Sequence, residues 1–154
     1  MVGGKEIVGK NNKKEIIRMI LKNNPDIHTR PILPEDDDDT IKDKQKKMFI
    51  TGANSQLEIY FSDKTTTVIY APKNYSFDGA TIPFKIGKGN MKLQIPALFH
   101  DIICDNKSIV EYNRALSSEI FYKALLLCHV NKVIAIIMFF FVDNFQKLMD
   151  WNNK

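Results

Sequence analysis

Short runs of β-branched and aromatic residues dominate the middle of the chain. The runs lie at 48–50, 57–61 and 66–70, and turn-forming residues such as Gly52 and Asn54 separate them. Runs of this length and composition, divided by turn residues, are typical of β-strands. We therefore expect the three runs to form a small antiparallel meander.

Beyond residue 92 the apolar residues recur at the spacing of an α-helix. A first helix is predicted around 95–103 with Pro96 in its first turn, where a missing N–H costs nothing, and further helices are predicted over about 109–128 and 132–151. A loop over 73–92 precedes them. The third helix is expected to bury one apolar face, formed by Ile134, Met138, Phe141, Phe145 and Leu148.

The first 47 residues have a different pattern. The isoleucine and leucine residues of 13–22 have helical spacing, which predicts a short amphipathic helix that ends at Asn23-Asn24-Pro25. Residues 25–47 contain three prolines and five consecutive acids, so an extended linker is expected there. The fold class is therefore α+β, with a single domain over 48–154 and an N-terminal arm over 1–47.

The composition limits the number of domains and the class of protein, but it does not indicate a function. A chain of 154 residues with 44% hydrophobic content suits one domain, and a net charge of +4 does not indicate nucleic acid. The longest uncharged apolar stretch, 133–142, is shorter than the roughly 20 residues that cross a bilayer. A membrane-active protein is the less favoured alternative. Cys104 and Cys128 lie in apolar helical patterns, which favours reduced thiols in a reducing compartment.

Two segments carry candidate chemistry. Asp78 and Thr81 belong to a run, Asp78-Gly79-Ala80-Thr81-Ile82-Pro83, whose turn residues would hold both side chains in place. His100 and Asp101 flank the apolar stripe of the first helix, where a histidine can bind a metal or act as a general base. The alternatives are a structural turn and a histidine whose hydrogen bonds are satisfied at the edge of the core. One His and one Cys, His100 and Cys104, fall short of a zinc motif.

Arg114 shares a helix face with Ser117 and Ser118, where packing is expected to be tight. A guanidinium in such a place needs an acidic partner, and Asp78 or Asp101 is the natural candidate. The alternative is an arginine that extends from the helix start into solvent. The run 87–90 lacks the spacing of a phosphate-binding loop and is interpreted as a flexible turn.

The motifs around Asp78, His100-Asp101 and Arg114 occur in an order that resembles the domain of unknown function 1353 family, which is found largely in bacteriophages and prophages. The resemblance covers roughly residues 55–150. The family pattern is a strand leading into Asp-Gly-Ala-Ser-Ile-Pro, a helix with His-Asp, and a helix with Arg followed by Ala-Asp and Phe. Thr81 preserves the hydroxyl of the usual Ser, whereas Ser117-Ser118 removes a carboxylate, which Glu119 would have to replace if the activity is retained.

The resemblance implies a virion-associated structural or interaction protein of a phage tail or head–tail region, made in the bacterial cytoplasm, with the arm 1–47 binding other virion proteins. The alternative is a small metal-dependent hydrolase of bacterial cell wall. In it Asp78, His100 and Asp101 would hold a divalent metal, and the catalytic set would be Asp78, Thr81, His100, Asp101 and Arg114. A third hypothesis, an HD-type phosphohydrolase using His28, His100-Asp101 and Asp143, is disfavoured by the predicted strands.

Overall fold

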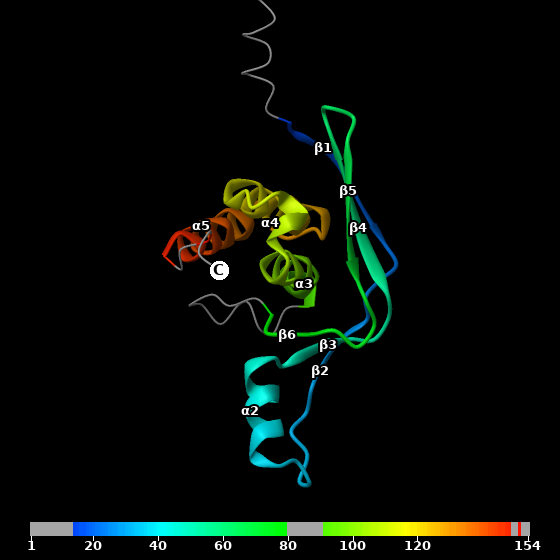
Figure 1. The fold of residues 1–154 in the computed structure, drawn as a ribbon, viewed down its shortest axis with the longest axis vertical. Helices are drawn as coiled ribbons and strands as arrows, with labels where there is room; N and C mark the ends of the chain where they lie inside the picture. The colour runs from blue at the N-terminus through cyan, green and yellow to red at the C-terminus, as the bar shows by residue number, and fades with distance from the viewer. Residues whose placement is uncertain (1–13, 80–90, 149–150, 152–154) are drawn as a thin grey trace, which may run out of the picture.

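The structure is a computed structural model that describes residues 14–79, 91–148 and 151 (Figure 1). The described residues form two three-stranded antiparallel sheets and four α-helices, so the expected α+β class is confirmed. In chain order the elements are β1 Ile16–Lys22, β2 Ile27–Thr29, α2 Asp38–Lys46, β3 Phe49–Thr51, β4 Ser55–Phe61, β5 Thr66–Ala71, β6 Ser76–Phe77, α3 Met91–Asp105, the 3-10 helix η1 Lys107–Val110, α4 Arg114–Leu127 and α5 Lys132–Leu148.

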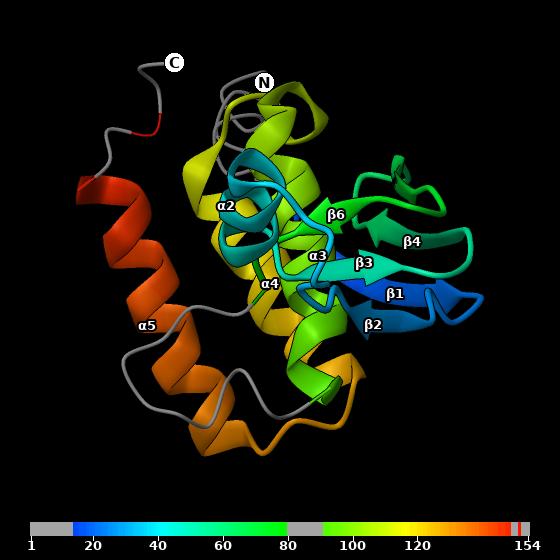
Figure 2. The same cartoon turned by 90° about the horizontal axis from the view of Figure 1, so that it is seen from below.

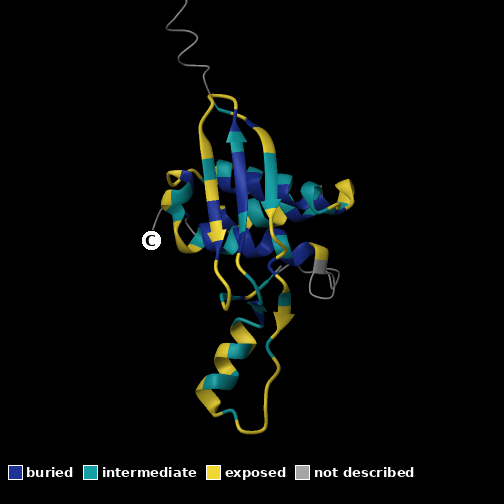
Figure 3. Ribbon diagram, turned by 90° about the vertical axis from the view of Figure 1, so that its right-hand side faces the viewer, coloured by how far each residue is buried: buried dark blue, intermediate teal, exposed yellow. Residues whose placement is uncertain are grey.

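The larger sheet has the order β1-β4-β5, and α3 and α4 pack on one of its faces. Leu57 and Ile59 of the central strand β4 are buried together with Leu98 and Ile103 of α3, and they form the main core (Figure 3). α5 packs against α4 and is separated from the strands by the other two helices (Figure 2). The apolar stripe predicted for the first helix is thus confirmed as a core face.

The expected meander of three consecutive strands is wrong in one part. β4 and β5 form a hairpin, but β3 pairs with β2 and β6 in a second sheet. The reason lies at Gly52, whose backbone N–H donates to the carbonyl oxygens of Pro25 at 2.9 Å and Asp26 at 2.8 Å. These bonds hold the link between β3 and β4 against the segment after β1, so it does not close a hairpin.

Residues 16–22 are a strand, not the predicted helix. β1 pairs with β4 in a register that includes Met19 opposite Ile59 and Leu21 opposite Leu57. The spacing of its apolar residues fits a helix, but a helix of about ten residues is marginal by itself. Pairing with β4 satisfies the backbone of this isoleucine-rich segment, and β-branched residues favour the extended form. Each of the two sheets therefore contains strands both from the predicted arm, 1–47, and from the predicted domain, 48–154.

The predicted linker over 25–47 contains β2 and α2 and is not simply extended. Asp37 caps α2 because its side chain accepts a hydrogen bond from the backbone N–H of Thr40 at 2.8 Å. Asp38 and Asp39 occupy the first turn and lysines the last turn, which is the favourable arrangement for the helix dipole. The run of acids thus starts a helix. α2 buries none of its residues and projects from the two sheets (Figure 3).

The three C-terminal helices are present with altered limits. α3 begins at Met91, so Pro96 lies in its second turn and not its first. The second predicted helix is interrupted, because Glu111 and Tyr112 adopt left-handed backbone conformations after η1 and α4 begins only at Arg114. In addition, α5 buries Ala135, Met138 and Gln146, whereas the predicted core residues Phe141, Phe145 and Leu148 are exposed. Residues 133–142 of α5 are all apolar, so the sequence of this part did not select the buried face.

Candidate functional site

His100 and Asp101 are neighbours on α3 but belong to two different polar clusters. Successive residues of a helix point about 100° apart. His100 is directed at α4 and α5, where it joins a hydrogen-bonded set that we call the inner network: His100, Arg114, Ser117, Ser118, Asp143 and Gln146. Asp101 is directed at the segment between β5 and α3, where it joins the acidic cluster: Tyr75, Asp78, Asp101 and Asp105.

The inner network is centred on Gln146 of α5. Its Nε2 donates to Ser118 Oγ at 2.7 Å, and Ser118 Oγ donates to Asp143 Oδ1 at 2.8 Å. Its Oε1 accepts from Ser117 Oγ at 3.1 Å and lies 2.8 Å from His100 Nε2. Gln146 and both serines are buried, so each of these hydrogen bonds takes the place of a hydrogen bond to water that the group makes in the unfolded chain.

The direction of these bonds fixes the tautomer of His100. An ionised carboxylate only accepts hydrogen bonds, so Ser118 must donate to Asp143 and accept from the amide of Gln146. The oxygen of Gln146 then faces His100 and can only accept. His100 therefore carries a proton on Nε2, and in the neutral ring Nδ1 is left as the acceptor, with Cys104 Sγ 3.8 Å away.

Burial lowers the pKa of His100, and the hydrogen bond to Gln146 only partly offsets this. The ring also lies against Phe121, with 5.2 Å between ring centroids. His100 is therefore a neutral side chain held by an amide and an aromatic ring. This arrangement matches the histidine with satisfied hydrogen bonds that the sequence left open as an alternative.

Arg114 is paired with Asp143 of α5, so the expectation that Asp78 or Asp101 would be its partner is wrong. Lys147 Nζ lies 3.5 Å from the other carboxylate oxygen of Asp143. Burial works to raise the pKa of Asp143, but the hydrogen bond from Ser118 and the charges of Arg114 and Lys147 hold it below its usual value. Asp143 therefore stays ionised and anchors α4 to α5.

This contact also accounts for the missing acid at Ser118. The family resemblance places a carboxylate at that position, which Glu119 would have to replace if the activity is retained. Instead, Asp143 lies beside Ser118 and accepts its hydrogen bond. The negative charge is thus supplied from the next helix, within reach of the same arginine.

The acidic cluster has a different electrostatic balance. Burial, and then the charges of Asp105 and Asp78, raise the pKa of Asp101 to about 7, while Lys47 and a hydrogen bond from Tyr75 oppose the shift. The Tyr75 hydroxyl donates to Asp105, and burial together with this bond raises the pKa of Tyr75. A carboxyl group whose pKa lies near neutrality can exchange a proton at physiological pH.

Gly79 fixes the position of Asp78. Its backbone has a φ of 84°, and a Cβ atom at this place would lie 2.4 Å from the Phe49 ring and 2.6 Å from the amide oxygen of Gln94. Only glycine fits both the conformation and the space. Asp78 itself is exposed. Thr81 lies outside the described residues.

The structure thus divides the predicted site. Asp78 and Asp101 are close enough for one charge to act on the other, whereas His100 and Arg114 belong to the inner network. Within the described part of the chain, no three His, Cys, Asp or Glu side chains are arranged to hold a metal ion, so Asp78, His100 and Asp101 do not form a metal site. The HD set is not assembled either, since the described partner of His28 is Asp26 and that of Asp143 is Arg114.

Sequence reasoning missed Gln146, Tyr75 and Asp105. Gln146 lies on the buried side of α5 with Ala135 and Met138, and the half-buried Asp143 lies three positions before it. Polar residues at that spacing near a buried face indicate a hydrogen-bonded network in the core. The signal was missed because the opposite face of this helix was predicted to be buried. Tyr75 and Asp105 gave no signal, because their contact joins segments 30 residues apart.

The opposite side of α5 is an apolar surface, which we call the α5 surface. Phe140, Phe145 and Leu148 are 59%, 62% and 83% exposed, and Val133 and Ile136 are exposed beside them. Soluble monomers seldom expose contiguous apolar patches of several hundred Å². None of the described helices is long and apolar enough to span a membrane.

Comparison with known proteins gives one match. The model of a family described as a protein of unknown function (DUF1353) matches residues 56–142. No curated protein and no solved structure matches the chain significantly. The matched range includes Asp78, His100, Asp101 and Arg114, whereas Asp143 and Gln146 lie just beyond its end.

Proposed function

We propose that this chain, which belongs to the DUF1353 family of proteins of unknown function, is a structural and interaction protein of a bacteriophage particle, located in the tail or head–tail region. The motif resemblance, which implies a phage or prophage setting, supports the location. The α5 surface is the observation that carries the interaction role.

A partner for the α5 surface must cover large apolar side chains. Phe140 and Phe145, each with roughly 150–250 Å² of total surface, together with the exposed Val133, Ile136 and Leu148 give the patch an area of several hundred Å². Standard interfaces bury about 800 Å² on each partner. The α5 surface thus has the size of the apolar centre of such an interface, and another structural protein of the particle is the proposed occupant.

Helix α2 of the arm 1–47 would supply a second, polar contact with the partner. α2 has no buried residue and is fastened to the preceding segment by ion pairs of Lys44 with Asp36 at 2.7 Å and of Arg30 with Asp43 at 3.0 Å. These contacts give the projecting segment a defined shape. A charged surface of this kind suits the rim of an interface, where specificity and orientation are set.

The inner network also fits a structural role better than a catalytic one. His100 and Arg114, which the hydrolase hypothesis needed at a metal or at substrate, are occupied by Gln146 and Asp143. Their contacts join α3, α4 and α5. We expect their loss to affect folding before it affects any chemistry.

The test combines particle composition with two matched variants. Phe140→Ser with Phe145→Ser removes apolar groups from α5, and Val68→Ser with Tyr70→Ser removes two exposed side chains from β5. Purified particles should contain the wild-type protein in fixed stoichiometry and at least tenfold less of the α5 variant. The β5 variant should be incorporated normally. Absence of the wild-type protein from purified particles, or equal incorporation of both variants, would contradict the proposal.

A second candidate function is the hydrolase of bacterial cell wall, and it depends on Asp101. A carboxyl group with a pKa of about 7 beside an exposed Asp78 has the properties of a general acid or base. Asp101→Asn should then abolish release of soluble fragments from purified cell wall while the protein stays folded. If wild type and variant both release none at any pH between 5 and 9, with and without added divalent metal, this candidate is eliminated.

A further inference from the structure

The far end of the arm carries two exposed aliphatic side chains. The segment 30–36 joins β2 to α2 and forms the end of the projection that is farthest from the helices α3, α4 and α5 (Figure 1, Figure 3). Within it Ile32 is 50% exposed and Leu33 is 41% exposed. We call these two residues the arm tip. Aliphatic groups in this place add little to the core of their own chain, and burying them against a partner would be favourable.

Hydrogen bonds fix the backbone of the arm tip. The backbone N–H of Leu33 donates to Asp36 Oδ2 at 2.8 Å, and that of Asp36 donates back to the carbonyl oxygen of Leu33 at 3.1 Å. Lys44 Nζ donates to the carbonyl oxygen of Pro31 at 2.9 Å, which ties the tip to α2. Pro31 and Pro34 on either side restrict the backbone further. A binding group that is ordered in advance loses less conformational entropy when it binds.

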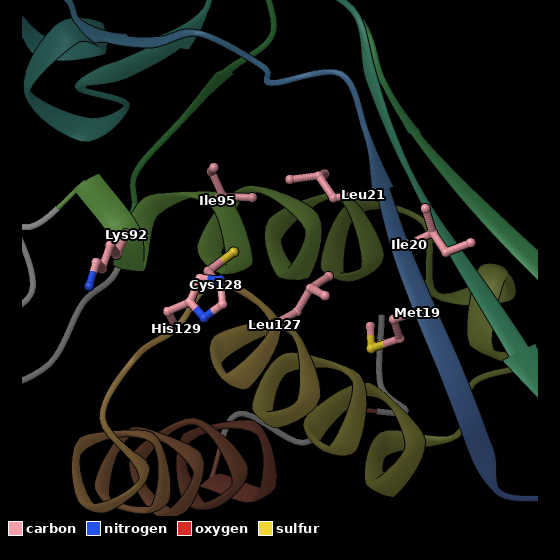
Figure 4. Close-up of a pocket in the computed structure, with 8 residues that line it drawn as sticks. All are labelled: Met19, Ile20, Leu21, Lys92, Ile95, Leu127, Cys128 and His129. Atoms are coloured by element: carbon pink, nitrogen blue, oxygen red, sulfur yellow. The ribbon is translucent and has the colours of Figure 1, made fainter.

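The body of the molecule offers an apolar cavity. It has a volume of about 440 Å³ and lies between β1, the start of α3 and the end of α4, apart from the inner network, the acidic cluster and the α5 surface (Figure 4). We call it the β1 pocket. Its lining includes Met19 and Leu21 of β1 and Leu127 of α4. Cys128 beside them is uncharged, because burial raises the pKa of its thiol to about 11. None of the eight residues labelled in Figure 4 is acidic.

The arm tip and the β1 pocket suit each other but lie apart within one chain. The tip is apolar and is followed by the exposed acids Glu35 and Asp37, whereas the pocket is apolar and its lining contains no acid that would repel them. The ion pair of Lys44 with Asp36 keeps the tip beside α2, away from the sheet that contains β1 (Figure 1, Figure 3). A second copy of the chain presents the same pocket without this constraint.

We propose that the arm tip of one copy of this chain inserts into the β1 pocket of a second copy. The contact is heterologous, because two different surfaces meet, and each pair keeps one free tip and one free pocket. Association can therefore continue head to tail into a ring or a filament. Two aliphatic side chains make a small contact, so binding should be weak and should depend on concentration. This contact goes beyond the proposed role of the α5 surface and does not depend on it.

Two variants each remove one half of the contact. Ile32→Ser with Leu33→Ser removes the apolar tip, and Cys128→Trp fills the pocket with a large ring. Sedimentation equilibrium from micromolar to millimolar concentrations should show wild-type masses that rise beyond the mass of a dimer. Each variant alone should associate more weakly by about tenfold or more, because every contact needs one tip and one pocket.

A mixture of the two variants gives the sharper result. The tip variant keeps its pocket and the pocket variant keeps its tip, so the mixture should form an equimolar heterodimer and nothing larger. Met19→Trp, which fills the pocket from β1, takes the place of Cys128→Trp if urea denaturation shows that the latter is unfolded. Val68→Ser with Tyr70→Ser changes two exposed residues of β5 and is the matched control, which should associate like the wild type.

A wild type that stays monomeric at every concentration, a tip variant that associates like the wild type, or a mixture that does not pair would each overturn the proposal. Loss of association in Phe140→Ser with Phe145→Ser, but not in the tip variant, would assign the contact to the α5 surface instead. If the tip variant fails to enter particles while the purified wild type stays monomeric, the arm tip binds another protein and not a second copy. None of these results alters the expected presence of the wild-type protein in particles, so the two proposals fail separately.

Discussion

His100 and Asp101 are adjacent on α3, but their electrostatic surroundings are opposite. His100 enters a network in which the single carboxylate, Asp143, is balanced by Arg114 and Lys147, and hydrogen bonds link the helices from His100 to Arg114. Asp101 enters a cluster with Asp78 and Asp105, where like charges accumulate and are only partly offset by Lys47 and a hydrogen bond from Tyr75. The inner network thus stabilises the ionised state of its acid, while the acidic cluster stabilises the protonated state.

The two clusters should therefore give opposite dependences of stability on pH. Burial lowers the pKa of His100, so the unfolded chain binds the extra proton first and stability falls as pH drops below about 6.5. The pKa of Asp101 is raised from 3.8 to about 7, so the folded chain binds more protons between these values. That contribution makes stability fall as pH rises from about 4 to 7.

The largest expected effect is the loss of the Asp143 carboxylate. Asp143→Ala leaves Arg114 and Ser118 without their acceptor in a half-buried place, and we expect a loss of about 3 kcal/mol in the free energy of unfolding. Urea denaturation at pH 7 measures it, with the exposed Glu35→Ala as control. A loss below about 0.5 kcal/mol would show that the inner network does not hold the helices together.

His100→Ala should cost about 2 kcal/mol, because a half-buried ring is removed and Gln146 loses a donor. It should also remove part of the decline in stability below pH 6.5. His28→Ala is the matched control, since this histidine is exposed on β2. Denaturation curves from pH 5 to 8 give both quantities, and an unchanged pH profile would argue against a neutral, half-buried His100.

Ser118→Asp restores an acid at the position where the family resemblance places one. Next to Asp143 it should destabilise the fold by about 1–2 kcal/mol through like-charge repulsion. Adding Asp143→Ser should recover at least half of that loss, because Arg114 would then face a single carboxylate again. Urea denaturation of the single and double variants measures these changes. If the losses of stability from the two substitutions simply add, a carboxylate at position 118 does not replace the one at position 143.

Asp101→Asn should give the smallest change in the free energy of unfolding, and it should raise this free energy where the other variants lower it. It removes the repulsion with Asp105 and Asp78, so stability at pH 8 should rise by about 1 kcal/mol, with little change at pH 4. Thermal or urea denaturation at the two pH values measures this. A loss at pH 8 would show that the ionised Asp101 is favourably paired and that the raised pKa is wrong.

Part of this fold and site could be predicted from local patterns. The strands at 57–61 and 66–70, the apolar stripe of α3 and the existence of three C-terminal helices follow from spacing and residue type. The need of Arg114 for an acid followed from its charge and expected burial. Asp78-Gly79 was also readable as a turn, and Gly79 indeed has the positive φ that favours glycine.

The features that were wrong or missed depend on contacts between distant segments. Residues 16–22 became a strand because the edge of β4 was open to them, and β3 left the predicted meander because Gly52 is bonded to Pro25 and Asp26. In each case the local pattern allowed two structures, and a partner far along the chain stabilised one of them.

The sequence by itself determined which residues could carry charge, bury surface or start a helix. Only the tertiary structure decided that Arg114 pairs with Asp143, that His100 bonds to Gln146 and that Phe140 and Phe145 of α5 face outward. The physical reason is the same for all three. Residues 133–142 of α5 are all apolar, so the rotation of the helix about its own axis is set by packing against α4. That rotation turns Asp143 and Gln146 towards α4 and Phe140 and Phe145 towards solvent.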